Sequence, residues 1–571
     1  MSDTRQNKKP LEVIQEPCYN TGVQQKICMV RIFCAFIAIW FFKWRLYRLF
    51  PPYPPISEER CLQRSRYRVL SPGPMERTCP EGRVLFTVLK LHRPQTRRPQ
   101  RKERNMKTYQ PMTGKVLDAL RSIVGEKYVW TDPDHLEQYK TDEETDPRKF
   151  HLPEAVAAPG STEEISAILK LANREQFPVT PRSGGTSVSD GAIPVCGGLV
   201  LLMERMDKIL KVDPEGMYLV AQAGARTAAV QQAARDKGLF YAGDPCSADS
   251  CLIGGNLATN AGGDKAVRYG TTRNQVHAME VVLPNGQIAR LGSRCKKNAT
   301  GYCLDQLVIG SEGTLGIITE VTLKLLPQAP YKADVLAIFT DQAKATGIVP
   351  VLLREGLDPI SVEFMDNAFV RSASDYSQLD LGYYEDGSYV ILTLECFNEE
   401  DLDRKLIQLD ELCRSHGAAD VSVADERMWT LRKNCLESAR VLSKVMTSDD
   451  FVVPLDKIDQ AIDVLSAEAR KYPFQVFTLA HAGDGNLHFA ILKGELSNQE
   501  WEEALDAFHE KAYQYIYALG GKLSGEHGIG AKKVKQLAQL ADPGELYMME
   551  TIKRALDPLD ILNPGKVLEV F

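Results

Sequence analysis

The order of hydrophobic and polar positions predicts alternating helices and strands in the part of the chain that follows residue 106. Gly114–Val124 has an amphipathic helical pattern. Ser161-Thr-Glu-Glu164 has the hydroxyl-x-x-acid spacing that caps a helix, which is predicted to run through Leu171, and Thr227–Lys237 is the next helix. Short apolar runs predict strands at Glu154–Pro159, Val179–Arg182, Leu199–Leu202 and Tyr218–Gln222. Strands that alternate with helices indicate an α/β unit.

The pattern changes near Gln328-Ala-Pro330, where long and charged helical segments begin. These segments are Glu399–His416, Leu455–Lys471 and Asn498–Leu519, and apolar strands such as Tyr389–Leu394 separate them. A chain of 571 residues is too long for one ordinary core, so two or three domains are expected. We place a boundary near residue 328, which gives one domain over 106–328 and another over 329–571.

Residues 1–105 differ from the rest in composition, with 21 Lys and Arg against 8 Asp and Glu, whereas the whole chain has a net charge of −6. Cys28–Trp44 is apolar, but Arg31 interrupts it, and the clean run Ile32–Phe42 is short for a membrane span of roughly 20 residues. A stretch rich in Pro and Arg follows, and Met106 then opens a sequence like an ordinary protein start. We favour a basic, disordered or non-native extension outside the working protein. A basic membrane anchor and a targeting peptide stay open.

Three glycine-rich segments fall within the first predicted domain. They are Pro181–Ala192, Asp244–Ser247 with Ile253–Gly263, and Val308–Ile317. Glycines let backbone N–H groups converge on phosphate oxygens, and hydroxyl groups add further donors. Three such segments indicate a large, extended ligand that carries phosphate.

Several protein classes are disfavoured by the composition and by missing motifs. The glycine spacing matches neither G-x-G-x-x-G nor G-x-x-x-x-G-K-S/T, so a standard nicotinamide fold and a nucleotide triphosphatase are not supported. The net negative charge argues against a nucleic-acid binder. The 13 scattered cysteines include no CxxC pair, which favours free thiols in a reducing compartment over disulfides or an iron–sulfur site.

Two segments concentrate histidine and carboxylate groups. Leu479–His488 places His481 and His488 on either side of a Gly-Asp-Gly-Asn turn, and Ser524–Gly530 contains Glu526 and His527. A hairpin would bring the two imidazoles together, and Glu526 would supply a third ligand for a divalent metal. His527 would then act as a base. The alternative is a tight glycine turn with incidental histidines.

The glycine-rich segments resemble the FAD-binding domain of vanillyl-alcohol-oxidase-type (PCMH-type) flavoproteins. The histidine motifs resemble the C-terminal domain of the branch that contains D-lactate dehydrogenase, glycolate oxidase and D-2-hydroxyglutarate dehydrogenase. The resemblance covers roughly residues 110–570. It implies an α+β fold, in which a two-subdomain FAD domain precedes an α+β substrate or cap domain with an antiparallel sheet.

The resemblance also implies roles for individual residues. It makes His481, His488 and Glu526 the ligands of a divalent metal (Zn, Mn or Fe), and His527 the base. Relatives with covalent flavin carry histidine where this chain has Thr186, so FAD is expected to bind without a covalent bond. The FAD site would contain Arg182, Ser183, Gly184, Gly185, Thr186, Ser187, Asp244, Pro245, Gly254, Gly255, Asn256, Thr259, Asn260, Gly262, Gly263, Gly310, Glu312, Gly313, Gly316, Ile317 and Asn563.

The expected reaction is the metal-assisted oxidation of a D-2-hydroxy acid to the 2-oxo acid. Arg432, in a segment like the family's Trp-x-x-Arg, is the candidate partner of the substrate carboxylate; a solvated helix arginine is the alternative. Asp450 is interpreted as structural, or as a support for the ligands. Relatives that use a dicarboxylate carry a lysine about fifteen residues after that arginine, where an ungapped count gives Thr447 and Lys444 is close. This favours D-lactate or glycolate.

Other functions and partners stay open. The alternatives are a D-2-hydroxyglutarate dehydrogenase, an oxidase that uses oxygen, a non-catalytic flavoprotein subunit of a redox complex, and a membrane-anchored interaction protein. Electrons are expected to pass to an external acceptor, such as electron-transfer flavoprotein, an iron–sulfur subunit or a quinone. We expect a cytoplasmic protein, and leave open peripheral membrane association and homodimer formation.

Overall fold

The computed structural model describes residues 107–379, 387–424 and 426–571. The expectations for residues 1–105, including the apolar stretch Cys28–Trp44, lie outside the described residues. In the described ranges, none of the helices combines the length and the apolar character that a membrane crossing requires.

The first sheet has four strands in the order β1-β2-β4-β3, and β2, β4 and β3 run parallel. Helix α4 begins after Ser161, whose Oγ accepts a hydrogen bond from the backbone N–H of Glu164 at 3.2 Å, as the capping pattern predicts. Helix α2 buries Val116, Leu120 and Val124 on one face. The bounds are α2 (Gly114–Val124), β1 (Val129–Trp130), β2 (Ala155–Ala157), α4 (Thr162–Glu175), β3 (Val179–Arg182) and β4 (Leu199–Leu202).

The second sheet has five antiparallel strands in the order β5-β6-β10-β8-β9. It shares one hydrophobic core with the first sheet, and the late residues Ile561 and Leu562 belong to the same core. The bounds are β5 (Ile209–Asp213), β6 (Tyr218–Gln222), α5 (Thr227–Arg235), β7 (Leu239–Phe240), α6 (Ile253–Thr259), α7 (Ala266–Tyr269), β8 (Val276–Val282), β9 (Ile288–Gly292), α8 (Leu304–Val308), β10 (Ile317–Lys324) and β11 (Leu326–Pro327).

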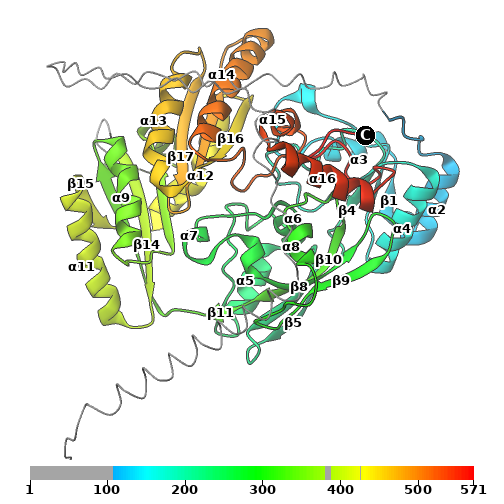
Figure 1. Ribbon diagram of the computed structural model, residues 1–571, viewed down its shortest axis with the longest axis horizontal. Helices are drawn as coiled ribbons and strands as arrows, with labels where there is room; N and C mark the ends of the chain where they lie inside the picture. The colour runs from blue at the N-terminus through cyan, green and yellow to red at the C-terminus, as the bar shows by residue number, and fades with distance from the viewer. Residues whose placement is uncertain (1–106, 380–386, 425) are drawn as a thin grey trace, which may run out of the picture. The chain divides into compact units, whose positions relative to one another are not determined.

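The third large sheet is antiparallel throughout and has the order β15-β12-β14-β13-β17-β18-β16. Helices α9, α11, α13 and α14 pack on one face of this sheet (Figure 1), and α10 and α12 pack on the other. The strands are β12 (Tyr331–Phe339), β13 (Ser361–Met365), β14 (Ser388–Cys396), β15 (Ala418–Val423), β16 (Met446–Val452), β17 (Gln475–His481) and β18 (Asn486–Leu492). The helices are α9 (Gln342–Arg354), α10 (Asn367–Ser377), α11 (Glu399–Ser415), α12 (Glu426–Leu442), α13 (Ile458–Ala469) and α14 (Asn498–Ala518).

The remaining helices and turns complete the described chain. They are α3 (Pro133–Leu136), α15 (Val534–Leu540), α16 (Pro543–Leu556) and the 3₁₀ turns η2 (Glu126–Tyr128), η3 (Glu137–Tyr139), η4 (Pro147–Lys149), η5 (Thr272–Gln275) and η6 (Leu455–Lys457). The mixture of sheets and helices confirms the α+β expectation. The boundary near residue 328 stays a prediction; at this place the chain passes from β11 to β12.

The alternation of side chains along the third sheet decides which residues reach the candidate site. Leu487, Phe489 and Ile491 of β18 pack with α9, α13 and α14, so His488 and Ala490 lie on the opposite face with α10 and α12. The same rule puts Asp450 on the face of His488, to which it is paired across β16 and β18. Thr447 therefore lies on the other face from Asp450.

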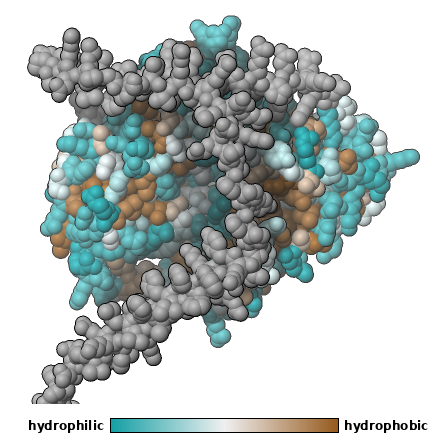
Figure 2. All heavy atoms as spheres, viewed as in Figure 1, coloured by the Kyte–Doolittle hydropathy of each residue, from teal (hydrophilic) through white to brown (hydrophobic). Residues whose placement is uncertain are grey.

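The viewed surface carries no broad apolar band in its described part. In Figure 2, hydrophilic residues cover most of the outer surface that is not grey, with hydrophobic residues in small groups between them. Among the exposed large side chains, Phe397 follows β14, Ile407 lies in α11 and Val423 ends β15. Scattered exposed apolar residues of this kind are ordinary for a folded surface.

Candidate active site

The β17–β18 hairpin brings the two predicted histidine ligands together. His481 ends β17 and His488 follows Asn486 in β18, and their ring centroids are 5.1 Å apart at right angles. Glu526 Oε1 lies 3.2 Å from His481 Nε2 and 3.3 Å from His488 Nε2. One donor atom from each of the three residues falls within 4.8 Å of the others, as a shared metal ion requires.

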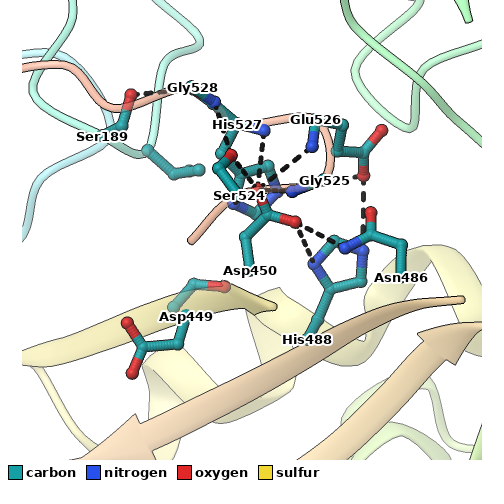
Figure 3. Close-up of polar contacts among 12 residues, drawn as sticks. Ser189, Asp449, Asp450, Asn486, His488, Ser524, Gly525, Glu526, His527 and Gly528 are labelled. Carbon is teal, nitrogen blue, oxygen red and sulfur yellow. Dashed lines mark hydrogen bonds and ion pairs between the residues drawn. The ribbon is translucent and has the colours of Figure 1, made fainter. Parts of the chain in front are cut away.

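A second group of possible ligands contains Asp450, His488 and His527. Asp450 is fully buried, and its oxygens are already occupied, as Figure 3 shows. Oδ2 accepts hydrogen bonds from the Ser524 hydroxyl and from the backbone N–H groups of three successive residues, Gly525, Glu526 and His527, at 3.0, 3.1 and 2.8 Å. Oδ1 accepts from Asn486 Nδ2 at 2.6 Å. The first group is therefore better suited to a metal, and Asp450 holds the loop that carries Glu526 and His527.

The turns at the site require glycine. Gly485, in the hairpin turn, has a φ of 86°, and a Cβ there would collide with the backbone carbonyl of Val453. Gly530 has a φ of 55°, and a Cβ there would meet the carbonyl of Ser189. Only glycine adopts such a backbone without strain while its neighbours approach so closely. The glycines of both histidine motifs thus serve the geometry of the site.

The electrostatics keep the two carboxylates of the cluster ionised. Burial would raise the pKa of Glu526, but His481 and His488 hold that pKa well below its ordinary value. Burial would also raise the pKa of Asp450, but His527, Lys533 and His488 outweigh it and keep it low. Two ionised carboxylates beside three imidazoles form a donor set that suits a divalent cation.

Burial determines the protonation state of His527. Burial lowers its pKa to about 4, against a smaller opposing effect of Asp450, so the imidazole is neutral near neutral pH. Its Nδ1 is buried and has no hydrogen-bond partner among the described residues. Its backbone carbonyl accepts a hydrogen bond from Ser189 Oγ at 2.8 Å. A neutral imidazole can accept a proton.

Sequence reasoning missed Glu363, a residue of β13 that is completely buried. Its Oε1 lies 2.8 Å from His481 Nδ1, and its Oε2 accepts from Arg432 Nε and Nη2 at 2.9 and 2.7 Å. Burial would raise the pKa of Glu363, but His481 and Arg432 lower it. Arg432 does not line the cavity described below, so its contact with a substrate carboxylate stays a prediction.

A cavity lies beside the cluster and contains most of the residues predicted to bind FAD. Asn563 Oδ1 and Ser311 Oγ, two polar atoms of its walls, are buried without a partner among the described residues, which fits a ligand rich in hydrogen-bonding groups. Glu526 and His527 line the same cavity. The predicted residues that line it are Ser183, Gly184, Gly185, Thr186, Ser187, Pro245, Gly254, Gly255, Asn256, Thr259, Glu312, Gly313, Gly316, Ile317 and Asn563.

Six predicted FAD residues do not line this cavity. Asn260 and Gly310 line a second, smaller cavity, to which Glu526 also contributes. Arg182 donates through Nη1 to the carbonyl of Thr141 at 2.7 Å. Asp244 pairs with Lys265 and bridges to Gly263. A Cβ on Gly262 would lie 2.8 Å from Glu526 Oε2. The absence of a side chain at Gly262 therefore leaves room for Glu526.

Glu312 has a contact that its glycine-rich context did not indicate. Although the residue lines the cavity, its carboxylate accepts hydrogen bonds from the backbone N–H groups of Ile529 and Gly530, each at 2.7 Å. It thereby joins the loop before β10 to the loop that carries His527. Leu436, four residues after Arg432 on α12, also lines the cavity and was missed; its spacing on the helix is the signal that could have found it.

The comparison of Thr447 with the lysine of dicarboxylate-using relatives does not bear on the walls of the cavity. The ungapped count placed this residue where dicarboxylate-using relatives carry lysine, but its side chain lies on the sheet face opposite to Asp450 and His488. A count along the chain takes no account of the two-residue alternation of a strand, so Thr447 gives no information on the substrate.

Two segments of the chain match known families. Residues 153–292 match the FAD binding domain family, and residues 329–567 match the family of FAD linked oxidases, C-terminal domain. The chain is 36% identical to a D-lactate dehydrogenase of Anaerostipes hadrus over 425 residues, which cover 73% of this chain and 89% of that protein. It is 35% identical to glycolate oxidase subunit GlcD of Bacillus subtilis (strain 168) over 426 residues, which cover 74% and 90%.

The fold also matches that of a solved structure. A crystal structure of p-cresol methylhydroxylase with substrate bound superposes with a TM-score of 0.69 at 17% identity, over 81% of this chain and 99% of that one. This likeness confirms the PCMH-type fold expected for the FAD domain. The chain therefore belongs to the FAD-linked oxidases, as an FAD-dependent oxidoreductase of the branch that includes D-lactate dehydrogenase and the glycolate oxidase subunit GlcD.

Proposed function

We propose that this protein oxidises a small D-2-hydroxy monocarboxylic acid, D-lactate or glycolate, to the 2-oxo acid with the help of a divalent metal. The observation that carries the proposal is that Glu526 and His527 line the same cavity as the glycine-rich loops. A substrate in that cavity would lie between the groups that handle its proton and the cofactor that accepts its electrons. No such arrangement is needed by a subunit that only supports other proteins.

The residues of the chain fit both expected groups. The loop over 183–187, Asn256 and Asn563 would hold FAD, and His481, His488 and Glu526 would hold the metal. When bound, FAD supplies the acceptor for hydride and the metal lowers the pKa of the substrate hydroxyl. Two histidines and a carboxylate suit Zn, Mn and Fe alike.

His527 takes the hydroxyl proton in this proposal. Its imidazole is neutral near neutral pH because burial lowers its pKa, and it faces the cavity with Glu526. Asp450 keeps His527 in position through the backbone N–H of that residue at 2.8 Å. The proton therefore leaves the substrate toward a group that a fully buried carboxylate has fixed in place.

The preference for one carboxylate rests on the walls of the cavity. No lysine or arginine is among the described residues that line it, and Leu436 contributes an apolar surface. A second substrate carboxylate would have no cation to pair with there and would lose hydration without compensation. A dicarboxylate such as D-2-hydroxyglutarate is the alternative, and it would need a cation from outside these walls.

We also propose an external electron acceptor. The proposal rests on the sequence, whose 13 cysteines include no CxxC pair of the kind that iron–sulfur sites use. Electron-transfer flavoprotein, an iron–sulfur subunit or a quinone would then oxidise the reduced flavin.

Visible absorption tests the proposal directly. The full chain, loaded with FAD and a divalent metal and kept anaerobic, is mixed in turn with D-lactate, L-lactate, glycolate and D-2-hydroxyglutarate. Bleaching of the flavin band by D-lactate or glycolate is expected. Bleaching by D-2-hydroxyglutarate alone would assign the alternative substrate, and a yellow protein that none of these acids bleaches would refute a 2-hydroxy acid of this set.

A further inference from the structure

We infer that Glu363 is a positioning residue that orients His481 for metal binding and joins it to Arg432. The inference rests on the proposed metal-assisted function, and it assigns a role to a residue that neither glycine nor histidine motifs mark. Glu363 lies in β13, 118 residues before His481. It touches no wall of the cavity, so it acts through other residues.

The sheet itself places Glu363 against His481. Strands β13 and β17 are antiparallel neighbours, and Glu363 is the register partner of His481. Val362 and Phe364 pack toward α9, α13 and α14, so Glu363 points to the opposite face, where α10 and α12 lie. Its side chain is fully buried, and that of His481 is 3% exposed. The contact is therefore set by strand pairing and shielded from water.

The two ring nitrogens of His481 have different partners. Nδ1 lies 2.8 Å from Glu363 Oε1, and Nε2 lies 3.2 Å from Glu526 Oε1. Glu363 Oε1 lies in position to accept a hydrogen bond from a protonated Nδ1. The lone pair of Nε2 is then left for a metal at the Glu526 side. Carboxylates behind metal-binding histidines commonly fix the tautomer and the ring in this way.

Arg432 holds the other half of the carboxylate. Its Nε and Nη2 both donate to Glu363 Oε2, at 2.9 and 2.7 Å. This pair of hydrogen bonds occupies Oε2, leaves Oε1 to His481 and holds the carboxylate between α12 and β17. It also supplies a positive charge beside a carboxylate that has no access to water. Arg432, Glu363 and His481 thus form one chain of contacts from α12 to the metal ligands.

Metal affinity measures this role apart from catalysis. The affinity of the FAD-loaded full chain for Zn²⁺ is determined by competition with a chelating dye, in the wild type and in Glu363→Gln. The amide has only one oxygen, so it cannot accept hydrogen bonds from both Arg432 and a protonated Nδ1 of His481. We expect the affinity to fall about 10- to 100-fold, the usual effect of losing such a partner. The visible spectrum of bound Co²⁺ should change as well, since the ligand geometry loosens.

Asp366→Asn is the matched control. Asp366 is also a buried carboxylate near the end of β13, and it accepts a hydrogen bond from the backbone N–H of Thr478 on β17 at 2.6 Å. Like Glu363, Asp366 contacts β17, but it does not contact the His481 ring. Its variant should keep the Zn²⁺ affinity and the Co²⁺ spectrum of the wild type, which separates the role of Glu363 from a general disturbance of the sheet.

The outcomes distinguish the inference from the function on which it rests. A folded, flavin-bound Glu363→Gln protein with wild-type Zn²⁺ affinity would overturn the inference and leave the proposed function standing. A wild-type protein that binds no divalent metal would overturn both. If Glu363→Gln does not fold, Glu363→Asp keeps the charge and shortens the reach, and an affinity equal to that of the wild type would again contradict the inference.

Discussion

Gly530 donates its backbone N–H to the Glu312 carboxylate at 2.7 Å, across 218 residues of sequence. The neighbouring N–H of Ile529 donates to the other oxygen of the same carboxylate at the same distance. Glu312 lines the cavity of the glycine-rich loops, and the two donors follow His527 closely in the chain. The loop of the predicted base is thus fastened to the wall of the predicted cofactor site.

Glu312→Ala should therefore destabilise the protein and slow the reaction. Two N–H groups lose their acceptor, which costs about 1–3 kcal/mol for each group that stays buried. The rate of flavin reduction should fall with the looser His527 loop. Chemical denaturation and stopped-flow absorption measure the two effects. Glu312→Gln, which keeps one acceptor, should be intermediate, and wild-type stability in the alanine variant would disprove the anchoring role.

His527→Ala should retain FAD and reduce it slowly. Removal of a general base typically costs about 10²–10⁴ in rate, and the anaerobic bleaching of the flavin band measures that loss. His509→Ala is a suitable control, because His509 is another partly buried histidine. It pairs with Asp449, whose side chain points away from the Ser524–Gly528 loop (Figure 3). Equal rates for His527→Ala and the wild type would remove His527 as the base.

Treatment with a strong chelator should abolish activity while the flavin stays bound. The three candidate ligands belong to the hairpin and the Ser524–Gly530 loop, whereas the residues predicted to hold FAD lie mostly in the other domain, so metal loss should leave the flavin absorption band intact. Added divalent metal should restore the activity. Full activity in a sample verified as free of metal would exclude the metal from the reaction.

Asp366 predicts a pH dependence of stability. Burial raises its pKa to about 6 from an ordinary 3.8, against hydrogen bonds from the Phe369 and Thr478 N–H groups. Between these values the folded state binds more protons than the unfolded state, so stability falls as the pH rises through this window, by about 3 kcal/mol at most. Well above pH 6 Asp366 is ionised in both the folded and the unfolded state, and stability falls no further.

Asparagine does not titrate, so the Asp366→Asn protein should lose this pH dependence of stability. Denaturant unfolding of both proteins at about pH 4 and about pH 7 measures it, and the variant should gain stability relative to the wild type toward the higher pH. The asparagine oxygen can still accept from the Phe369 N–H that caps α10. A difference between the two proteins that stays constant with pH would show that Asp366 does not titrate in this range.

Local signals explain what the sequence could predict. The cap at Ser161, the strand over Val179–Arg182 and the β17–β18 hairpin are each decided by residues close together in the chain, and all three were predicted correctly. The glycine-rich loops could be assigned to one ligand because their composition is unusual in itself. The site residues predicted in these segments rest on the same motifs.

Long-range contacts explain which site residues the sequence could not predict. Glu363 looks like an ordinary strand residue until β13 pairs with β17, and Glu312 looks like part of a glycine loop until the Ile529 N–H group reaches it. Both partners lie far from their carboxylates in the chain, at separations of 118 and 217 residues. The inference from Thr447 failed for a different reason. Spacing along the chain does not determine on which face of a sheet a side chain lies.

The late residues of the chain bear on how the holoprotein is made. Leu562 bridges to Val179, the N–H of Asn563 donates to the carbonyl of Val179 at 2.8 Å, and Asn563 lines the cavity. During synthesis the strands around Val179 leave the ribosome hundreds of residues earlier. The cofactor compartment therefore cannot close until translation has passed Asn563, so flavin capture follows synthesis of the second domain, and a premature stop codon just before Asn563 would yield a colourless protein.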